Sequence, residues 1–500
     1  MKVCLINPIL FSFQRVRSRS LKNNVGMSFY PPLGLCYIAN MLEKNGIKVK
    51  VIDRNSLMTK NHSNQLVVDN ITEGEIRKFK PDIVGITVTT PTFFDVRCNI
   101  VRIIRKMGDE TVIVVGGPHV SALPEDTLRS CSEINIACKG EGELSMLEIA
   151  NGDKLEDIVG ITYRDGDNII NNQNRKPHDN INDFCFPSRH LVDMKYYCKG
   201  NPHVMHGIYS RATTIFTSRG CPYNCTFCAG SVTLGRGIRF QSVELVVEEI
   251  EILIKDYKIE GLYFADDIFD VDKDRAVNIC RKIIEKNIHK EIYWNAQLRA
   301  NSMDKNLLKL MKEAGCIRVD VGFESGSQKT LDIINKKTTV AQNYRAAELL
   351  HEAGIQIHAN IIVGLPGEDM EDLNKTRNFM KNIRPHWIGF GEFVPLPGSK
   401  LFDELSDRSL ISKENVEVLE GLNFTKLDDE NFYKFVKDVC NKIVNPIRLK
   451  NYILQNWKKP SALLYMLKLI VEFLAATCQS TLKSFLLIWN KHVRIHNKRL

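Results

Sequence analysis

The chain has 500 residues, more than one hydrophobic core usually serves, so we expect two to four domains. Its 44% hydrophobic and 25% charged residues are typical of a globular protein. The formal net charge of +9 is spread thinly, with no dense Lys/Arg run before the last ten residues. This pattern gives no reason to expect a nucleic-acid partner, and it suits an anionic ligand or a membrane surface equally well.

Fourteen cysteines stand at irregular spacings, in a chain far too large to need disulfide staples, so we expect a reducing compartment. The first ten residues lack the apolar length and the small-residue cleavage site of a signal peptide, and they are predicted to form a β-strand. No apolar stretch reaches the uninterrupted length of about 18 residues that a membrane span requires. These features predict a cytoplasmic protein.

Residues 1–150 alternate short apolar runs with helical patterns. Residues 2–7, 47–53 and 82–88 have the β-branched composition of buried strands, whereas 34–46 and 98–108 have the spacing of amphipathic helices. Such alternation is typical of βαβ crossovers. We therefore predict an α/β fold that begins with a doubly wound, Rossmann-like parallel sheet.

Small and polar residues follow several of these predicted strands. Because ligands bind at the carboxyl ends of the strands in such sheets, these residues are candidates for the lining of a pocket for a large ligand. The candidates are Thr87, Thr89, Gly116, Gly117, His119, Gly140 and Glu141. No G-x-G-x-x-G follows the first strand and no Walker lysine motif is present, so ordinary dinucleotide or ATP binding is not supported.

The rest of the chain divides into three predicted parts. Residues 151–205 are polar and irregular, as in a small β-ribbon followed by a linker. Residues 206–410 resume the strand and helix alternation, with six strand-plus-connection units in about 190 residues, which predicts a partial (β/α)6 barrel with its active site at the carboxyl ends of the strands. Residues 411–500 are predicted to be a helical C-terminal domain.

Three cysteines, Cys221, Cys225 and Cys228, follow the first predicted barrel strand. A structural zinc site needs four protein ligands, but the next cysteine is Cys280 and the next histidine is His289, both in the following unit. A [4Fe-4S] cluster held by three thiolates would instead keep one iron open for a substrate or cofactor. The sequence favours the cluster over zinc.

The C-x-x-x-C-x-x-C spacing, with Phe227 before the last cysteine and in this strand context, resembles the signature of the radical S-adenosylmethionine (SAM) superfamily. The resemblance implies that the amine and carboxylate of SAM chelate the open iron and that one electron converts SAM to a 5′-deoxyadenosyl radical. It also implies SAM contacts at the next four strand ends, where Arg299 would meet the carboxylate and Glu324 the ribose. The implied contacts are Asp266, Asp267, Arg299, Glu324, Ser325 and Gly364.

The N-terminal part, with Pro31 to Leu35 before its first helix and Gly116 to Val120 after its fourth strand, is similar to the cobalamin (B12)-binding domain of B12-dependent radical SAM proteins. The resemblance covers residues 1–405. The Asp-x-His-x-x-Gly motif that supplies a cobalt ligand in other B12 proteins is absent, and His119 is the only histidine of this domain at a suitable strand end.

This resemblance implies an enzyme that transfers a methyl group from methylcobalamin to an unactivated carbon of a small or lipid-like substrate, with flavodoxin or ferredoxin as reductant. A radical SAM/B12 oxidative cyclase is the alternative within the same class. A cobalamin-binding sensor with a structural cluster is an alternative of a different class. Methylthiotransferases share the barrel, but their additional cluster cysteines and C-terminal RNA-binding barrel are not evident here.

The segment 461–490 has the pattern of an amphipathic helix. Its polar residues form a narrow stripe if it is continuous, and residues 461–500 contain six Lys/Arg and one acidic residue. The segment is interpreted either as a helix or hairpin that packs on the barrel mouth or in a dimer, or as a helix that lies on a membrane surface.

Overall fold

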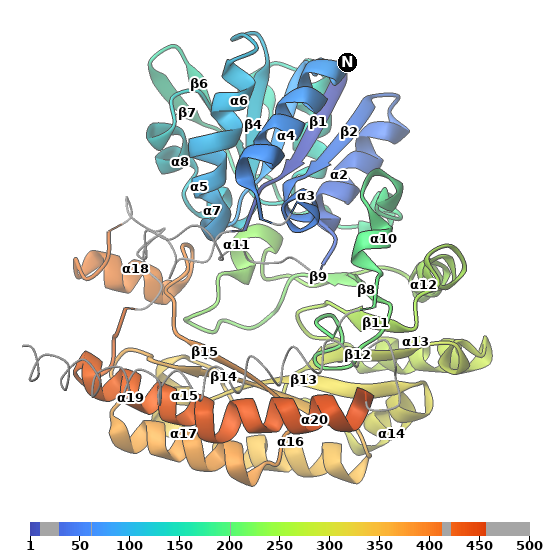
Figure 1. Cartoon of the computed structure of the whole chain (residues 1–500), viewed down its shortest axis with the longest axis vertical. Coiled ribbons are helices and arrows are strands. Elements are labelled where there is room, and N and C mark those ends of the chain that lie inside the picture. Colours follow the sequence, from blue (N-terminus) through green and yellow to red (C-terminus); the bar gives the residue numbers. More distant parts are fainter. Residues whose placement is uncertain (11–29, 62, 201, 413–421, 457–500) are drawn as a thin grey trace, which may run out of the picture.

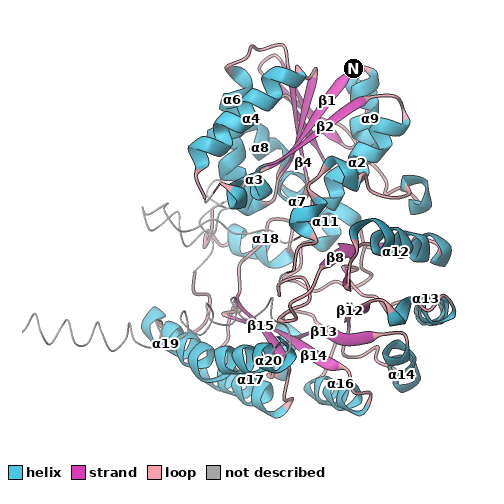
Figure 2. Cartoon of the chain, turned by 45° about the vertical axis from the view of Figure 1, so that its right-hand side comes forward, coloured by secondary structure: helices cyan, strands magenta, loops and turns pink. Residues whose placement is uncertain are grey.

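The computed structural model describes residues 1–10, 30–61, 63–200, 202–412 and 422–456. It contains two large sheets, one mainly and one wholly parallel, each with its own helices and placed one above the other in Figure 1. Helix α11 (Gly230–Leu234) lies between the two halves in Figure 1 and in the turned view of Figure 2. The loops that follow the strands of both sheets therefore face the same central region.

The N-terminal sheet has seven strands in the order β2-β1-β3-β4-β5-β6-β7. The five parallel strands are β1 (Lys2–Asn7), β2 (Lys48–Asp53), β3 (Ile83–Thr87), β4 (Val112–Gly116) and β5 (Ile136–Cys138). Helices make the crossovers that parallel strands require. They include α2 (Leu33–Lys44), α3 (Arg54–Lys60), α4 (Gln65–Phe79), α6 (Val101–Arg105), α7 (Pro118–Ala122) and α8 (Pro124–Ser130), and α9 (Glu143–Asn151) follows β5.

Two separate hydrophobic clusters cover the two faces of this sheet. On one face, α2 and α9 pack on Val3 and Leu5 of β1. On the other face, α4 and α6 pack on Cys4 and Ile6 of the same strand. Successive side chains of a strand point to opposite faces, so burial of all four residues requires helices on both sides. The predicted doubly wound sheet is confirmed.

The polar segment after residue 150 extends this sheet. Strands β6 (Ile161–Asp165) and β7 (Asn168–Asn171) form a hairpin that adds to β5 in the antiparallel direction. The sequence predicts this ribbon, but its place at the sheet edge depends on long-range pairing. The linker that follows contains α10 (Met194–Tyr197), and its buried Arg189 pairs with Glu249 at 2.7 Å.

The second sheet has six parallel strands in the order β15-β14-β13-β12-β11-β8, which is the reverse of chain order. The strands are β8 (Ala212–Ile215), β11 (Gly261–Phe264), β12 (Tyr293–Leu298), β13 (Cys316–Glu324), β14 (Gln356–Val363) and β15 (Trp387–Glu392). Each strand pairs with the next along the chain, which is the pattern of a half-barrel. The predicted partial (β/α)6 barrel is confirmed.

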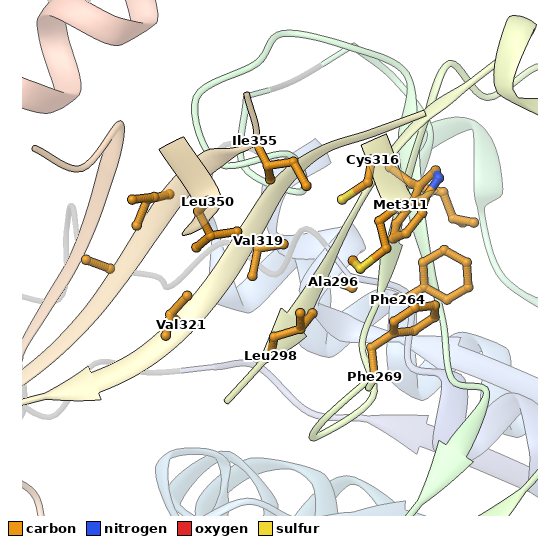
Figure 3. Close-up of a cluster of buried hydrophobic side chains, with 14 of the residues drawn as sticks. Phe264, Phe269, Ala296, Leu298, Met311, Cys316, Val319, Val321, Leu350 and Ile355 are labelled. Carbon is orange, nitrogen blue, oxygen red and sulfur yellow. The ribbon is translucent and has the colours of Figure 1, made fainter. Parts of the chain in front are cut away.

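Helices cover the outer face of the half-barrel. They are α12 (Val243–Tyr257), α13 (Lys273–Glu285), α14 (Lys305–Glu313), α16 (Val340–Glu352) and α17 (Met370–Asn382). Figure 3 shows this interface, in which Ala296, Leu298, Val319 and Val321 of neighbouring strands point toward the helix side chains. The residues that alternate with them, such as Asp320, therefore face the interior of the half-barrel.

The remaining described elements lie at the mouth and beside the half-barrel. Two short strands, β9 (Ser218–Arg219) and β10 (Arg239–Phe240), pair as an antiparallel ribbon and enclose the cysteine segment and α11. Helices α15 (Gln328–Ile333) and α18 (Lys400–Asp407) follow β13 and β15, and α19 (Asp429–Val439) and α20 (Asn445–Asn456) follow these.

Among the described helices, none has both the length and the apolar character needed to cross a bilayer. The predicted amphipathic segment 461–490 lies outside the described residues.

Candidate active site

The segment from Cys221 to Cys228, here called the cysteine loop, follows the first barrel strand. Gly220, directly before it, has a φ of 94°, and a Cβ at this position would collide with the carbonyl oxygen of Gly237, shortly before β10. Only glycine combines this backbone conformation with such a close approach. The sequence thus fixes the sharp turn that carries the chain from β9 into the cysteines.

Contacts with two later parts of the chain, around α15 and α18, hold the cysteine loop. The amide of Thr226 donates to the carbonyl oxygen of Ile334 at 2.9 Å, and the carbonyl oxygen of Thr226 accepts from the amide of Leu401 at 2.9 Å. The side chain of Phe227 packs into a hydrophobic cluster that includes residues of α15 and α18. The loop is therefore fixed by backbone hydrogen bonds and apolar packing that are independent of any ligand.

All three cysteines line a cavity of about 160 Å³, here called the barrel cavity. Charged side chains from the ends of several barrel strands complete its wall. These are Asp267 after β11, Arg299 after β12, Glu324 at the end of β13, and Lys336 after α15. Three of the six residues predicted to contact SAM thus lie around one cavity with the three cysteines.

Arg299 is the best-defined ligand-binding group of this cavity. It is only 4% exposed, its guanidinium lies 3.7 Å from the ring centroid of Tyr223, and its Nη1 lies 3.8 Å from Sγ of Cys225. Its Nη2 has no hydrogen-bond partner within the described ranges. A buried guanidinium nitrogen without a partner beside the cysteines is the donor that a ligand carboxylate requires.

Glu324 is paired rather than free. Its Oε1 lies 2.7 Å from Nζ of Lys336, and both side chains are less than a tenth exposed. Glu324 has a φ of 61°, and a Cβ on Gly322 would occupy the space of this ion pair. Lys336 carries no motif of its own and was missed in the sequence.

Burial, and then the charge of Asp266, raise the pKa of the Asp267 carboxyl above its usual range.

The other three predicted SAM contacts do not line the barrel cavity. The carboxylate of Asp266 accepts hydrogen bonds from the amides of Thr217 and Ser218, so it fixes the start of the cysteine segment. Ser325 is fully buried and shares a hydrogen bond of 2.9 Å with Thr376. Gly364 donates its amide to Glu368 at 2.8 Å, a bond internal to the loop after β14.

A second cavity, of about 630 Å³, lies between the carboxyl end of the N-terminal sheet and the cysteine loop, and is here called the interdomain cavity. Of the seven residues predicted to bind cobalamin, five line it: Thr87, Gly116, Gly117, Gly140 and Glu141. Gly34 at the start of α2 also lines it, and a Cβ there would meet nothing within 4 Å. The glycines keep side chains out of the cavity.

Thr89 and His119 do not line the interdomain cavity. The His119 ring is 3% exposed, stacks on Phe93 with 4.6 Å between ring centroids, and has Nδ1 3.3 Å from the hydroxyl of Thr90. Burial lowers the pKa of His119 to about 4. The prediction that His119 could approach a ligand at this edge is therefore corrected, because the first turn of α7 directs the ring into the hydrophobic layer.

A buried charge cluster connects the cysteine loop to the N-terminal sheet. Arg219 contacts Glu141 at 2.8 Å and Glu143 at 2.7 Å, and Arg239 contacts Glu141 at 2.7 Å. Burial tends to raise the pKa of the Glu141 carboxyl, but the hydrogen bonds and charges of Arg239 and Arg219 hold this pKa below its usual range. Both strands that enclose the cysteine loop are thus tied to one glutamate of the N-terminal part.

The two cavities meet at the cysteine loop. Phe227, Cys228 and Gly230 line both of them. A ligand in the interdomain cavity and a ligand in the barrel cavity would therefore be separated by a wall one residue thick. A loop with three thiols and an unpaired guanidinium in one cavity fits an iron–sulfur cluster with a carboxylate ligand, and a large glycine-lined cavity fits an amphipathic macrocycle.

Comparison with known proteins agrees with these features. Residues 215–380 match the radical SAM superfamily, and residues 24–150 match the B12 binding domain. The chain is 34% identical over 420 residues to an uncharacterized methyltransferase of Pyrococcus horikoshii, across 83% of this chain and 85% of that protein. The chain belongs to the cobalamin-binding radical SAM proteins.

Two further relatives are informative. The chain is 29% identical over 388 residues to the anaerobic magnesium-protoporphyrin IX monomethyl ester cyclase of Rubrivivax gelatinosus, across 76% of this chain and 67% of that protein. The structure of the radical SAM methyltransferase TsrM from Kitasatospora setae, with cobalamin and a [4Fe-4S] cluster bound, superposes with a TM-score of 0.64 at 20% identity, over 81% of this chain and 78% of that one. The last comparison shows a common fold.

The protein is therefore an enzyme that uses SAM, a [4Fe-4S] cluster and cobalamin, as the sequence predicted. It acts on a small molecule and requires a reductant. The alternative of a cobalamin sensor with a structural cluster is not supported.

Proposed function

We propose that the enzyme transfers a methyl group from cobalamin to a carbon atom of its substrate, with residues 1–150 as the cobalamin-binding domain and 206–410 as the radical SAM core. The observation that carries this proposal is the wall that the two cavities share at Phe227 and Cys228. When bound, the cluster and SAM supply a carbon-centred radical and cobalamin supplies the methyl group. Two such cofactors act on one carbon only if they are held next to each other.

Residues of the chain have separate tasks in this proposal. Cys221, Cys225 and Cys228 would bind the cluster, and Arg299, whose Nη2 has no partner among the described residues, would donate to the SAM carboxylate. The Lys336 ammonium neutralises Glu324, which is then fixed to accept hydrogen bonds from the ribose hydroxyls. Asp267, whose pKa burial raises, lines the same cavity and would accept a hydrogen bond from the amino group of SAM.

The charge cluster of Arg219 and Arg239 with Glu141 and Glu143 sets the distance between the two cofactors. These contacts span the boundary between the N-terminal sheet and the cysteine loop. Buried ion pairs of this kind have strict geometry and resist sliding of one part on the other. The apolar packing of Phe227 on the far side excludes water from the shared wall.

Similarity supports methyl transfer over cyclisation. The relative in Pyrococcus horikoshii, whose similarity covers more than four fifths of both chains, is described as a methyltransferase. An oxidative cyclase is the second candidate, because the cyclase of Rubrivivax gelatinosus is 29% identical over three quarters of this chain. Both candidates use the same cavities and differ in whether cobalamin delivers its methyl group.

Isotope transfer from SAM distinguishes the two candidates without knowledge of the substrate. The anaerobically reconstituted enzyme with hydroxocobalamin, a low-potential reductant and SAM carrying a deuterated methyl group should form deuterated methylcobalamin, seen by its visible spectrum and by mass spectrometry. It should also release 5′-deoxyadenosine. Release of 5′-deoxyadenosine with no methyl transfer to cobalamin in repeated reduction cycles would instead support the cyclase.

Contact with a membrane surface is a further part of the proposal, and it would suit a lipid-like substrate. It is supported by the sequence of residues 461–500, with six Lys/Arg and one acidic residue beside a broad apolar face. Sedimentation with anionic liposomes should carry down the full chain but not a chain that ends at residue 456. Equal sedimentation of both chains would contradict membrane contact.

A further inference from the structure

Three polar side chains in the interior of the half-barrel line neither cavity. His206 stands in the loop before β8, Asp320 in the middle of β13, and His358 near the start of β14. Nε2 of His206 lies 2.9 Å from Oδ2 of Asp320, and Nδ1 of His358 lies 3.1 Å from Oδ1 of the same carboxylate. The three groups offer ligand atoms that all lie within 4.8 Å of one another.

These contacts place two ring nitrogens against one carboxylate, where each becomes an ion pair only when its ring is protonated. Nε2 of His358 is buried with no hydrogen-bond partner among the residues that the structure describes. Asp320 is 2% exposed and His358 is 6% exposed. Buried polar atoms without partners are costly, whereas a cation between them would satisfy nitrogen lone pairs and carboxylate oxygen together.

The fold places the three groups firmly. Asp320 and His358 are direct partners in the pairing of β13 with β14, so their side chains leave the sheet on the same face at the same level. His206 has a φ of 44°, a conformation rare outside glycine, and the guanidinium of Arg318 donates to the carbonyl oxygens of Met205 and His206. Such a strained backbone persists only where the surroundings hold it, and it is typical of ligand sites.

We infer that His206, Asp320 and His358 bind a divalent transition-metal ion such as zinc, in a site separate from the iron–sulfur cluster. Two imidazoles and one carboxylate are the ligand set of such ions, whereas magnesium and calcium prefer oxygen ligands alone. Zinc takes such ligands at about 2.0–2.2 Å, and the three ligand atoms lie within 4.8 Å of one another. Three protein ligands leave at least one coordination position open to a ligand in the half-barrel.

The charges around the site are compatible with a cation. The buried Arg318 is two residues from Asp320 on the same strand, but its guanidinium donates to Gln356 at 2.5 Å and to Gln455 at 3.1 Å, away from the carboxylate. No ion pair joins Arg318 and Asp320 in the described part of the chain; the partners of this carboxylate are Tyr263 and the two histidines, whose rings bind a metal in the neutral form. The Tyr263 ring, 5.5 Å from the His206 ring, encloses the site on one side.

The proposed site and the cluster can be loaded independently. Asp320 precedes Glu324 by four residues on β13, which separates their backbones by about 13 Å along the strand, and none of the three proposed ligands lines the barrel cavity. Metal analysis of the full chain, with its cluster reconstituted and after gel filtration in zinc-containing buffer, should therefore find about one zinc per chain in addition to the cluster iron. Asp320→Asn and His358→Asn should each reduce zinc to below about a fifth while iron stays the same.

His386→Asn provides the matched control. His386 is a partly buried histidine whose Nδ1 accepts from the amide of Ile357, a role that the asparagine oxygen can keep. It should retain full zinc and full iron. The cluster absorption of each variant reports folding, and if Asp320→Asn fails to fold, His206→Asn in the preceding loop replaces it and should lose zinc likewise.

The main competing explanation for zinc in the full chain is that zinc binds to the three cysteines of the cysteine loop when they hold no cluster. X-ray absorption at the zinc edge separates the two sites, because the proposed site has only nitrogen and oxygen neighbours near 2.0–2.1 Å, whereas thiolate sulfur lies near 2.3 Å. The chain with all three loop cysteines changed to alanine should still bind one zinc. Sulfur ligation, loss of zinc in the cysteine variant, or no stoichiometric metal in the unaltered chain would each overturn the inference.

Discussion

The two cavities that meet at the cysteine loop are built in opposite ways. The interdomain cavity of about 630 Å³ is shaped by missing side chains, with Gly34, Gly116, Gly117 and Gly140 in its wall. The barrel cavity of about 160 Å³ is shaped by charged side chains at strand ends, several of them buried. A large macrocycle is bound through the free volume of its cavity and through apolar contacts, whereas a small zwitterion is bound by charges in fixed positions.

This difference sets how each cavity should respond to substitution. In the barrel cavity, removal of one charged side chain leaves another buried charge or a group of the ligand without its partner. Single substitutions there should therefore have large effects on ligand binding. In the interdomain cavity, each wall atom contributes little, so only an added side chain should matter. The four predictions that follow test this contrast from the largest effect to the smallest.

The largest effect is expected for Cys225→Ala. Two remaining thiolates cannot hold a cubane cluster with the required geometry, so bound iron and 5′-deoxyadenosine formation should both be lost. Cobalamin binding should remain, because Cys225 does not line the interdomain cavity. Iron analysis, EPR of the reduced protein and the visible spectrum of bound cobalamin provide the measurements.

The control for this variant is Cys98→Ala. Cys98 is a partly exposed cysteine of the N-terminal part that lines neither cavity. It should keep full iron and full 5′-deoxyadenosine release. Normal turnover by the Cys225 variant would disprove the assignment of the cysteine loop.

A substantial but incomplete effect is expected for Arg299. Hydrogen bonds between charged groups contribute about 1.5–3 kcal/mol, so Arg299→Ala should weaken SAM binding by about 10- to 100-fold. Arg299→Lys keeps the charge but loses the planar guanidinium, so its affinity for SAM should lie between those of the unaltered enzyme and Arg299→Ala. Calorimetric titration with SAM measures the change, and Arg345→Ala on the exposed surface of α16 is the control. An unchanged dissociation constant in Arg299→Ala would remove the guanidinium from the SAM site.

The sequence predicts much of the wall of both cavities, and for the barrel cavity the physical reason is local. Three thiols in eight residues have to share one ligand, and residues that follow parallel strands have to meet at one edge, so Cys221, Asp267, Arg299 and Glu324 follow from spacing and family resemblance alone. Neighbouring positions are harder to resolve. Asp266 and Asp267 are adjacent, but only Asp267 lines the cavity, because the carboxylate of Asp266 accepts hydrogen bonds from the amides of Thr217 and Ser218.

Features that depend on long-range packing could not be predicted. His119 follows the right strand, but the first turn of α7 decides that it faces Phe93 rather than the interdomain cavity. The pairing of Glu141 with Arg219 and Arg239 spans residues about 80 to 100 positions apart and carries no motif. The cluster of His206, Asp320 and His358 likewise appears only when β13 and β14 pair.

A smaller effect, confined to cobalamin, is expected for Gly34→Phe. A Cβ at Gly34 meets no neighbour, so a ring there enters the interdomain cavity without disturbing the core. Cobalamin affinity should fall about tenfold, a change of about 1.4 kcal/mol, and SAM affinity should not change. Gly74→Phe, on α4 and also without neighbours at its Cβ, is the matched control. Equal cobalamin affinity in both variants would contradict a cavity recognised by its free space.

The smallest effect on ligand binding, no change at all, is expected for His119, which should instead make stability depend on pH. Burial lowers the pKa of this histidine from 6.5 to about 4, so the unfolded chain binds more protons than the folded one between these two values. Its contribution to stability is therefore complete above pH 6.5 and is lost as the pH falls toward 4. At pH 5 the loss should be about 2 kcal/mol, relative to His119→Phe, which cannot titrate. Thermal unfolding at pH 7.5 and 5.0 measures this difference as several degrees in Tm.

The spectrum of bound cobalamin should be the same in both proteins, because the His119 ring lies behind the cavity wall. A changed spectrum in His119→Phe would place His119 at the ligand.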